Sequence, residues 1–298
     1  MKNEFENHLR KIEISNVPVI FLVGGKATRM SSLPYAALVG KPFLPISLNT
    51  KNLEIETLFF RNFKIFYELG IKNFYLILRE ESEGKKVEEY IKRIIKEINN
   101  KDEKINVQLL SKDFSQKETK ERNVYIVVNP EEKILKQILN LQPLISTPFV
   151  VVMGDVYYNG EEDELKEEIK RVIKIGIEKI NKRAIMFDAV LEKEQQLGKI
   201  DWNNLFFKLD KDGKMVKCSQ EESLVFASIS ILSQEIFDFL KKTDASNLHS
   251  KEFIEELLKS GRLYGEKLNI FSINVNHPED WRKVVEEAEK RRKQKVTT

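Results

Sequence analysis

Cysteine, histidine and long apolar runs are scarce in this chain, and each scarcity excludes a class of protein. The 298 residues contain one cysteine, Cys218, so no internal disulfide can form and a reducing cytoplasm is the expected environment. The residues around Cys218 contain no partner for a catalytic thiol. The three histidines, His8, His249 and His277, are scattered and lack the spacing of a zinc site.

The chain also lacks a strong net charge and a membrane-length apolar segment. Fifty Lys and Arg against 47 Asp and Glu give a net charge of +3, which is too balanced to indicate nucleic acid or a membrane surface as a partner. No run approaches the roughly 18 apolar residues of a spanning helix. Residues 1–15 are charged and lack the apolar core of a signal peptide. We therefore expect a cytoplasmic protein.

Short apolar runs alternate with longer amphipathic segments, a pattern typical of a mostly parallel sheet with crossover helices. The first half predicts strands at 18–23, 74–79, 105–110, 124–128 and 149–155 and helices at about 54–69 and 84–99. A further helix is predicted to begin with Asn129 as its N-cap and Pro130 at its first position.

After residue 155 the pattern changes. A long charged helix at about 161–181 precedes four short strands with hairpin chemistry at Asp212-Gly213, which indicate partly antiparallel pairing. Helices near 233–242 and 250–259, a strand at 268–275 and a helix from 278 complete the chain. The prediction is a three-layer α/β/α, Rossmann-like α/β fold. An N-terminal extension, residues 1–16, precedes a single domain over 17–298.

The stretch "VIFLVGGKATRMSSLPYAALVGKPFLPI", residues 19–46, begins as a strand and continues into a loop with two glycines. Gly24 and Gly25 let the backbone approach a ligand because no Cβ intervenes, and the N–H groups of such a turn can bind an anion. Arg29 and Lys41 add the positive charge that phosphates need. The stretch is either a phosphate cradle or an ordinary structural connection.

Two further candidates follow other predicted strands. Asp155 ends the very apolar strand "FVVVMGD", and Asn276 stands in "INVNHPEDW", just before the helix start at Pro278. In an open α/β sheet, ligands bind at the carboxyl ends of the strands. A carboxylate at that edge either holds Mg²⁺, which bridges phosphate oxygens, or caps a turn.

Together, "VGGKATRM", "GKPFLPI", "VVVMGD" and "NVNHPEDW" resemble, in order and spread, the motifs of the nucleotidyltransferase superfamily. That superfamily includes sugar-1-phosphate nucleotidyltransferases and molybdenum-cofactor guanylyltransferases, and its nucleotide-diphospho-sugar transferase fold is GT-A-like. The resemblance covers roughly residues 17 to 285. It implies a nucleotide-binding part at about 17–155 and an acceptor-binding part at about 156–285.

The resemblance also implies a reaction and a role for each residue. A sugar 1-phosphate or similar phosphate acceptor attacks the α-phosphorus of a nucleoside triphosphate, and pyrophosphate leaves. Arg29 and Lys41 would be catalytic, and Asp155 with Asn276 would hold Mg²⁺. The residues implied to bind the nucleotide are Val23, Gly24, Gly25, Lys26, Thr28 and Arg29. Family members are often oligomeric, so a homo-oligomer is an open expectation.

The chain departs from the family's pattern at several places. Ala27 replaces a motif glycine, Asn276 stands where many sugar enzymes have a second metal aspartate, and the usual loop that contacts the base is missing. These departures leave a non-catalytic nucleotide-binding or regulatory subunit as an alternative. A GT-A glycosyltransferase is a second alternative, although Tyr157 stands where the second aspartate of an Asp-x-Asp motif would be.

Overall fold

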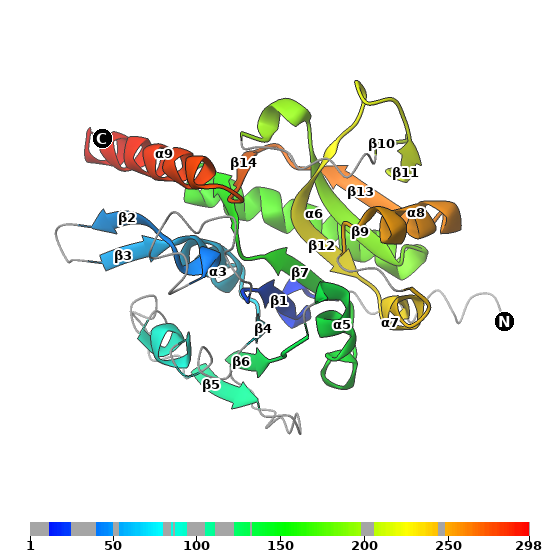
Figure 1. Cartoon of the computed structure of the whole chain (residues 1–298), viewed down its shortest axis with the longest axis horizontal. Helices are drawn as coiled ribbons and strands as arrows, with labels where there is room; N and C mark the ends of the chain where they lie inside the picture. The colour runs from blue at the N-terminus through cyan, green and yellow to red at the C-terminus, as the bar shows by residue number, and fades with distance from the viewer. Residues whose placement is uncertain are drawn as a thin grey trace.

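A mixed β-sheet forms the centre of the protein (Figure 1). The structure is a computed structural model, and it describes residues 12–24, 40–49, 54–79, 85, 87–93, 105–110, 122–131, 133–197, 206–243 and 248–297. Within them the main sheet has eight strands in the order β13-β9-β12-β7-β1-β4-β6-β5. These strands are β1 (Val19–Leu22), β4 (Asn73–Leu78), β5 (Ile105–Leu110), β6 (Arg122–Val128), β7 (Phe149–Met153), β9 (Met186–Leu191), β12 (Val225–Leu232) and β13 (Leu263–Lys267).

All neighbouring pairs in this sheet are parallel except those of β12, which is antiparallel to both β7 and β9. Helices cover both faces, because each face of a sheet buried on two sides must be matched by an apolar helical stripe. Helices α3 (Leu58–Glu68) and α6 (Glu162–Lys182) pack on one face, and α5 (Ile134–Leu139), α7 (Glu235–Leu240) and α8 (Lys251–Ser260) pack on the other. The predicted three-layer fold with a partly antiparallel second half is confirmed.

No helix in the described part of the chain is long and apolar enough to cross a membrane.

Helix α3 shows why the local sequence folds as it does. Thr57 is its N-cap and accepts a hydrogen bond from the Phe60 N–H at 3.1 Å. Phe59 and Phe66 pack edge-on against Phe21 of β1, with ring centroids 5.5 and 5.6 Å apart. Gly70 follows with φ +82°, as a C-terminal glycine should. The helix was predicted from residue 54, but residues 54–57 form strand β3 (Glu54–Thr57).

Two other predicted boundaries are also wrong. Asn129 does not cap a helix, since α5 begins at Ile134; its side-chain oxygen instead accepts from the Glu131 N–H at 3.3 Å, which forms a turn. The segment 268–275, predicted as one strand, contains the shorter β14 (Phe271–Asn274), and β13 was missed. Of the helix predicted at 84–99, residues 85 and 87–93 are helical, and the others lie outside the described residues.

Strand β14 belongs to a small sheet of its own, paired antiparallel with β8 (Val156–Asn159). A second small sheet joins β2 (Pro45–Asn49) to β3, and a third joins β10 (Phe207–Leu209) to β11 (Met215–Lys217). Figure 1 shows the last helix, α9 (Pro278–Thr297, red), beside β2.

A third apolar cluster lies where β2, β8, β14 and α9 meet, apart from the two clusters on the faces of the main sheet. We call it the edge cluster; its buried members are Leu44, Ile46, Leu58, Tyr157, Ile273, Val275 and Val284. Trp281 packs against it and donates its indole N–H to the Pro45 carbonyl at 2.9 Å. The edge cluster therefore joins segments that are far apart in the sequence.

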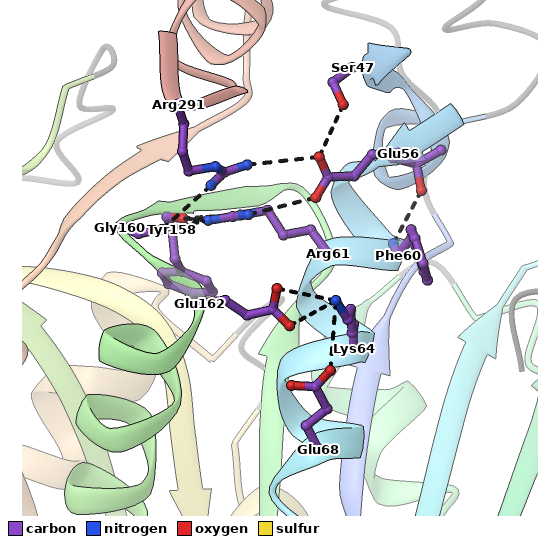
Figure 2. A network of polar contacts seen from close by, with 11 residues as sticks. Ser47, Glu56, Phe60, Arg61, Lys64, Glu68, Tyr158, Gly160, Glu162 and Arg291 are labelled. Atoms are coloured by element: carbon purple, nitrogen blue, oxygen red, sulfur yellow. Dashed lines mark hydrogen bonds and ion pairs between the residues drawn. The ribbon is translucent and has the colours of Figure 1, made fainter. Parts of the chain in front are cut away.

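A buried arginine ties α3 to the end of β8 (Figure 2). Arg61 is 7% exposed and donates to the carbonyl oxygens of Tyr158 at 3.2 Å and Gly160 at 2.9 Å. Glu56 Oε1 lies 3.6 Å from the Arg61 guanidinium, and Arg291 of α9 approaches the same carboxylate at 3.8 Å. Desolvation by burial lowers the pKa of Arg61. These contacts satisfy two carbonyls that a truncated side chain would leave without a donor.

Glu162, at the start of α6, gives the fold a testable pH dependence. Burial opposes its ionisation, but Lys64, whose Nζ lies 2.8 Å away, outweighs that effect together with Glu68 and Lys166, so the pKa of Glu162 lies below its ordinary value (Figure 2). A lowered pKa contributes stability that is present above the unfolded value, about 4.3, and is lost as the pH falls through the folded value. Glu162→Gln should therefore cost about 1 kcal/mol of unfolding free energy at pH 7.

At pH 3, Glu162→Gln should lower the free energy of unfolding by much less than at pH 7. Urea unfolding of both proteins at the two pH values measures the difference. Exposed Glu164 in the first turn of the same helix supplies the matched control, Glu164→Gln, measured in the same way. A cost for Glu162→Gln that is equal at both pH values would contradict this account.

Candidate active site

The carboxyl ends of β1 and β7 form the floor of the site. These strands are parallel neighbours, with Leu22 opposite Met153, so the residues that follow each strand emerge side by side. The Gly154 N–H continues the ladder by donating to the Leu22 carbonyl at 3.1 Å. A Cβ on Gly154 would lie 2.9 Å from that same oxygen, so only glycine allows the two strand ends to come this close.

Asp155 follows Gly154, whose N–H is bonded to β1, in a turn between β7 and β8, and two further hydrogen bonds hold the backbone after it. Its carbonyl accepts from the Val275 N–H at 2.9 Å. The carbonyl of the next residue, Val156, accepts from the Asn62 side chain of α3 at 2.8 Å. The position of the Asp155 carboxylate is thus set by contacts from both α3 and the segment after β14.

Lys41 enters the site from a short 3₁₀ turn, Lys41–Phe43, which begins after Gly40 at φ +73°. The buried Pro42 ring packs close to Gly154: a Cβ there would lie 3.0 Å from Pro42 Cγ. Leu44, which ends the turn, belongs to the edge cluster. The backbone of this turn is therefore anchored, and the Lys41 side chain extends from a fixed point.

Asn276 lies between β14 and α9. Its N–H and that of His277 donate to the carboxylate of Asp280 at 3.1 and 2.9 Å. Asp280 is 1% exposed and caps the start of α9, as its position in the sequence suggested. Asp280 is thus committed to these backbone groups, whereas the Asn276 side chain reaches Lys41.

The three side chains meet at one point. Lys41 Nζ lies 3.3 Å from Asp155 Oδ2 and 3.2 Å from Asn276 Oδ1. The side chains of Lys41 and Asp155 are only 16% and 21% exposed, so the ion pair is largely shielded from water. Residues from three separate motifs of the sequence thus form a single polar constellation at the edge of the sheet.

The oxygen atoms of this constellation suit a hard divalent cation. One carboxylate oxygen and one amide oxygen both reach a single nitrogen atom, so both can reach one ion at that place. Among the described residues no group of three or more His, Cys, Asp or Glu could hold a metal. Magnesium does not need three such protein ligands, because it usually keeps several water molecules and binds one or two carboxylates together with substrate phosphates.

The glycine loop is described only at its start. Val23 is buried, and the N–H groups of Val23 and Gly24 both donate to the Ile77 carbonyl of β4, at 3.2 and 2.9 Å. The Gly24 N–H is thus used by the sheet, and a Cβ on Gly24 would lie 2.9 Å from the Arg79 nitrogen. The other residues predicted for the nucleotide, Gly25, Lys26, Thr28 and Arg29, lie outside the described residues, as does Ala27.

The residues that position the site were not found from the sequence. Asn62 and Arg61 stand among the phenylalanines of "LFFRNFKIF", a segment whose apolar spacing predicts only an amphipathic helix. Two adjacent polar residues among apolar helical positions could have indicated contacts with another part of the fold, because buried polar groups need hydrogen-bond partners. Those partners are backbone carbonyls of β8 and of Gly160, directly after β8.

Solved structures that share this fold include nucleotidyltransferases. One is the inositol-1-phosphate CTP transferase from T. maritima, at 11% identity and a TM-score of 0.59, with 92% of this chain and 96% of that chain covered. Another is a UDP-glucose pyrophosphorylase complexed with UDP-glucose, at 16% identity and a TM-score of 0.64, with 93% and 99% covered.

A third match is HddC from Yersinia pseudotuberculosis, complexed with GMP-PN, at 18% identity and a TM-score of 0.56, with 91% of this chain and 99% of that chain covered. No protein-family model and no curated protein sequence matches the chain. At these identities the likeness extends to the fold, and it spans nearly the whole length of each matched chain.

The close approach at Gly154 yields a prediction. Gly154→Ala should lower the free energy of unfolding by about 2 kcal/mol, because the added methyl group overlaps a backbone oxygen and the Pro42 ring. Urea unfolding measures the loss. Gly70→Ala is a useful comparison, because a methyl group there meets nothing within 4 Å and only the left-handed backbone adds a cost, about 1 kcal/mol. A Gly154→Ala protein as stable as wild type would disprove the tight contact.

Proposed function

We propose that the protein is a Mg²⁺-dependent nucleotidyltransferase. It would transfer a nucleoside monophosphate from a nucleoside triphosphate to a sugar 1-phosphate or a similar phosphate acceptor. The observation that carries the proposal is the convergence of Lys41, Asp155 and Asn276 at the carboxyl edge of the sheet. The fold shared with solved nucleotidyltransferases supports it.

The reaction needs little covalent chemistry from the protein. An oxygen of the acceptor phosphate forms a bond to the α-phosphorus, the bond from that phosphorus to the bridging oxygen breaks, and pyrophosphate leaves with the electron pair. The protein's task is to align the two phosphates and neutralise their charge. The residues that would carry this out lie at an edge where ligands of open α/β sheets bind.

Each residue has a role that fits its chemistry. Asp155 and Asn276 would hold Mg²⁺, which supplies charge neutralisation at the triphosphate when bound. The Lys41 ammonium would stabilise charge at the α-phosphate or at the acceptor phosphate. Arg29, outside the described residues, is proposed to meet the departing β- and γ-phosphates, because its planar fork suits several oxygens. Residues 17–155 would bind the nucleotide and residues 156–285 the acceptor.

The glycosyltransferase alternative is disfavoured by Tyr157. This residue takes the place of the second aspartate of an Asp-x-Asp motif, but its ring is fully buried in the edge cluster, with the Arg61 guanidinium 5.0 Å from its centroid. Desolvation by burial also raises the pKa of its hydroxyl, so it stays protonated. Tyr157 is therefore a core residue and not a metal ligand. The non-catalytic alternative predicts that the protein binds nucleotide but turns over no substrate.

The first test is binding of a metal–nucleotide complex, measured as a thermal unfolding shift with ATP, GTP, CTP, UTP and dTTP, each with and without Mg²⁺. A ligand at 100 times its dissociation constant adds about 2.7 kcal/mol, or a rise of about 5 °C for a chain of this size. Asp155→Asn should abolish the Mg²⁺-dependent part for the triphosphate that binds. Asp238→Asn, at a carboxylate that is 76% exposed, should leave it unchanged. No shift with any of the five would contradict the proposal.

The second test is catalysis in the reverse direction, which avoids the need to know the acceptor in advance. Pyrophosphate and a panel of nucleotide sugars are supplied, and the nucleoside triphosphate formed is quantified. Lys41→Gln should lower kcat on the active nucleotide sugar by about 10²- to 10³-fold, the usual cost of one preorganised charge-stabilising donor. Nucleotide binding without any turnover across the panel would favour the non-catalytic alternative.

A further inference from the structure

The place proposed for the metal already contains a positive charge that belongs to the protein. Lys41 Nζ is within 3.3 Å of Asp155 Oδ2 and 3.2 Å of Asn276 Oδ1, the two oxygens that would ligate Mg²⁺. A lysine ammonium is a compact point charge with three donors, and here two of them point at the prospective ligands. An ammonium and a divalent cation cannot both occupy this position.

We propose that Lys41 is a resident cation of this site: it holds Asp155 and Asn276 together when no metal is bound, and an entering metal displaces it. This inference rests on the proposed function, since it takes Asp155 and Asn276 as the metal ligands. The displaced ammonium keeps its charge and turns toward the phosphate oxygens that accompany the metal. Metal entry and delivery of the catalytic lysine thereby become one event.

The construction of the turn allows the side chain to move while its backbone stays in place. Pro42 is buried, and the Leu44 N–H donates to the Lys41 carbonyl at 3.1 Å, so the Lys41 backbone is held. The side chain beyond it has four rotatable bonds and is 16% exposed. The carboxylate has less freedom, because the backbone on both sides of Asp155 is hydrogen-bonded. Displacement of the lysine is thus the motion that the structure permits most easily.

The resident cation also explains how a carboxylate with 21% exposure stays in place without metal. A carboxylate shielded from water needs a cation or several donors beside it. Lys41 meets that need in the metal-free protein and reduces the site's affinity for metal alone. Affinity for metal should therefore increase when the lysine is replaced by a neutral residue. If the salt bridge only maintained the shape of the site, the same replacement should lower the affinity for metal.

The experiment is a titration of the nucleotide-free protein with Mn²⁺, with free Mn²⁺ quantified by its electron paramagnetic resonance signal. Lys41→Gln should bind Mn²⁺ on the order of tenfold more tightly than wild type, because a unit charge a few ångströms from the ion is removed. Lys41→Arg keeps the charge and should match wild type. The double variant Lys41→Gln, Asp155→Asn should lose the gain. Lys170→Gln, at an exposed helical ion pair, is the matched control.

Unchanged or weaker Mn²⁺ binding by Lys41→Gln, including no detectable binding, would overturn the inference. A second readout concerns the amine itself: acetylation of Lys41 by a small reagent, followed by mass spectrometry, should become faster when Mg²⁺ is added to wild type but not to Asp155→Asn. An Mg²⁺-independent rate in wild type would also overturn it.

These outcomes are separable from the fate of the proposed function. If Mg²⁺ and a nucleotide stabilise the protein through Asp155 while Lys41→Gln binds Mn²⁺ no better, the resident-cation role fails and the nucleotidyltransferase assignment stands. If Lys41→Gln gains Mn²⁺ affinity but no triphosphate stabilises wild type, the resident cation stands and the assignment fails.

Discussion

Packing of the edge cluster determines where Lys41, Asp155 and Asn276 lie. Leu44 comes shortly after Lys41, Tyr157 shortly after Asp155, and Val275 directly before Asn276, and all three apolar side chains are buried together. Each such burial contributes about 1.5 to 3 kcal/mol, more than the contact between two polar groups at the edge of the sheet usually does. The polar atoms are thus positioned by hydrophobic packing of their neighbours. The fold itself brings the three polar side chains together, as the proposed charge stabilisation at a phosphate would require.

Much of the fold and part of the site could be predicted from the sequence, and the predictions that failed did so for physical reasons. The apolar run "FVVVMGD" indicated a central strand, and the rule that ligands bind at the carboxyl edge indicated that the loop after the first strand, Asp155 and Asn276 would share that edge. The contact of Lys41 with both Asp155 and Asn276 could not be predicted, because no spacing encodes a distance between residues so far apart. The β2–β3 hairpin was missed because Pro45 begins it and its few apolar residues, such as Leu48 and Ile55, stand among polar ones. The turn at Asn129 was read as a helix cap because both use the same side-chain chemistry.

The charges of the site are arranged around a single point. A carboxylate and an amide contribute less negative charge than two carboxylates would, and one lysine is enough to balance them when no metal is present. An amide oxygen at Asn276 in place of a second carboxylate fits the proposal that the site alternates between a monovalent and a divalent cation. Around it, Arg61 and Arg291 serve the fold: they satisfy carbonyls of β8 and of Gly160 beside it and flank Tyr157, which keeps the strand after Asp155 in place.

A crystal structure with Mn²⁺ and a non-hydrolysable nucleoside triphosphate tests the central claim most directly. The anomalous signal of Mn²⁺ locates the ion independently of any assumption about its ligands. The account predicts a peak bonded to Asp155 and Asn276 oxygens, with the Lys41 ammonium moved from between them onto phosphate oxygens. Mn²⁺ bound elsewhere, or bound there with Lys41 Nζ still in contact with both side chains, would contradict it.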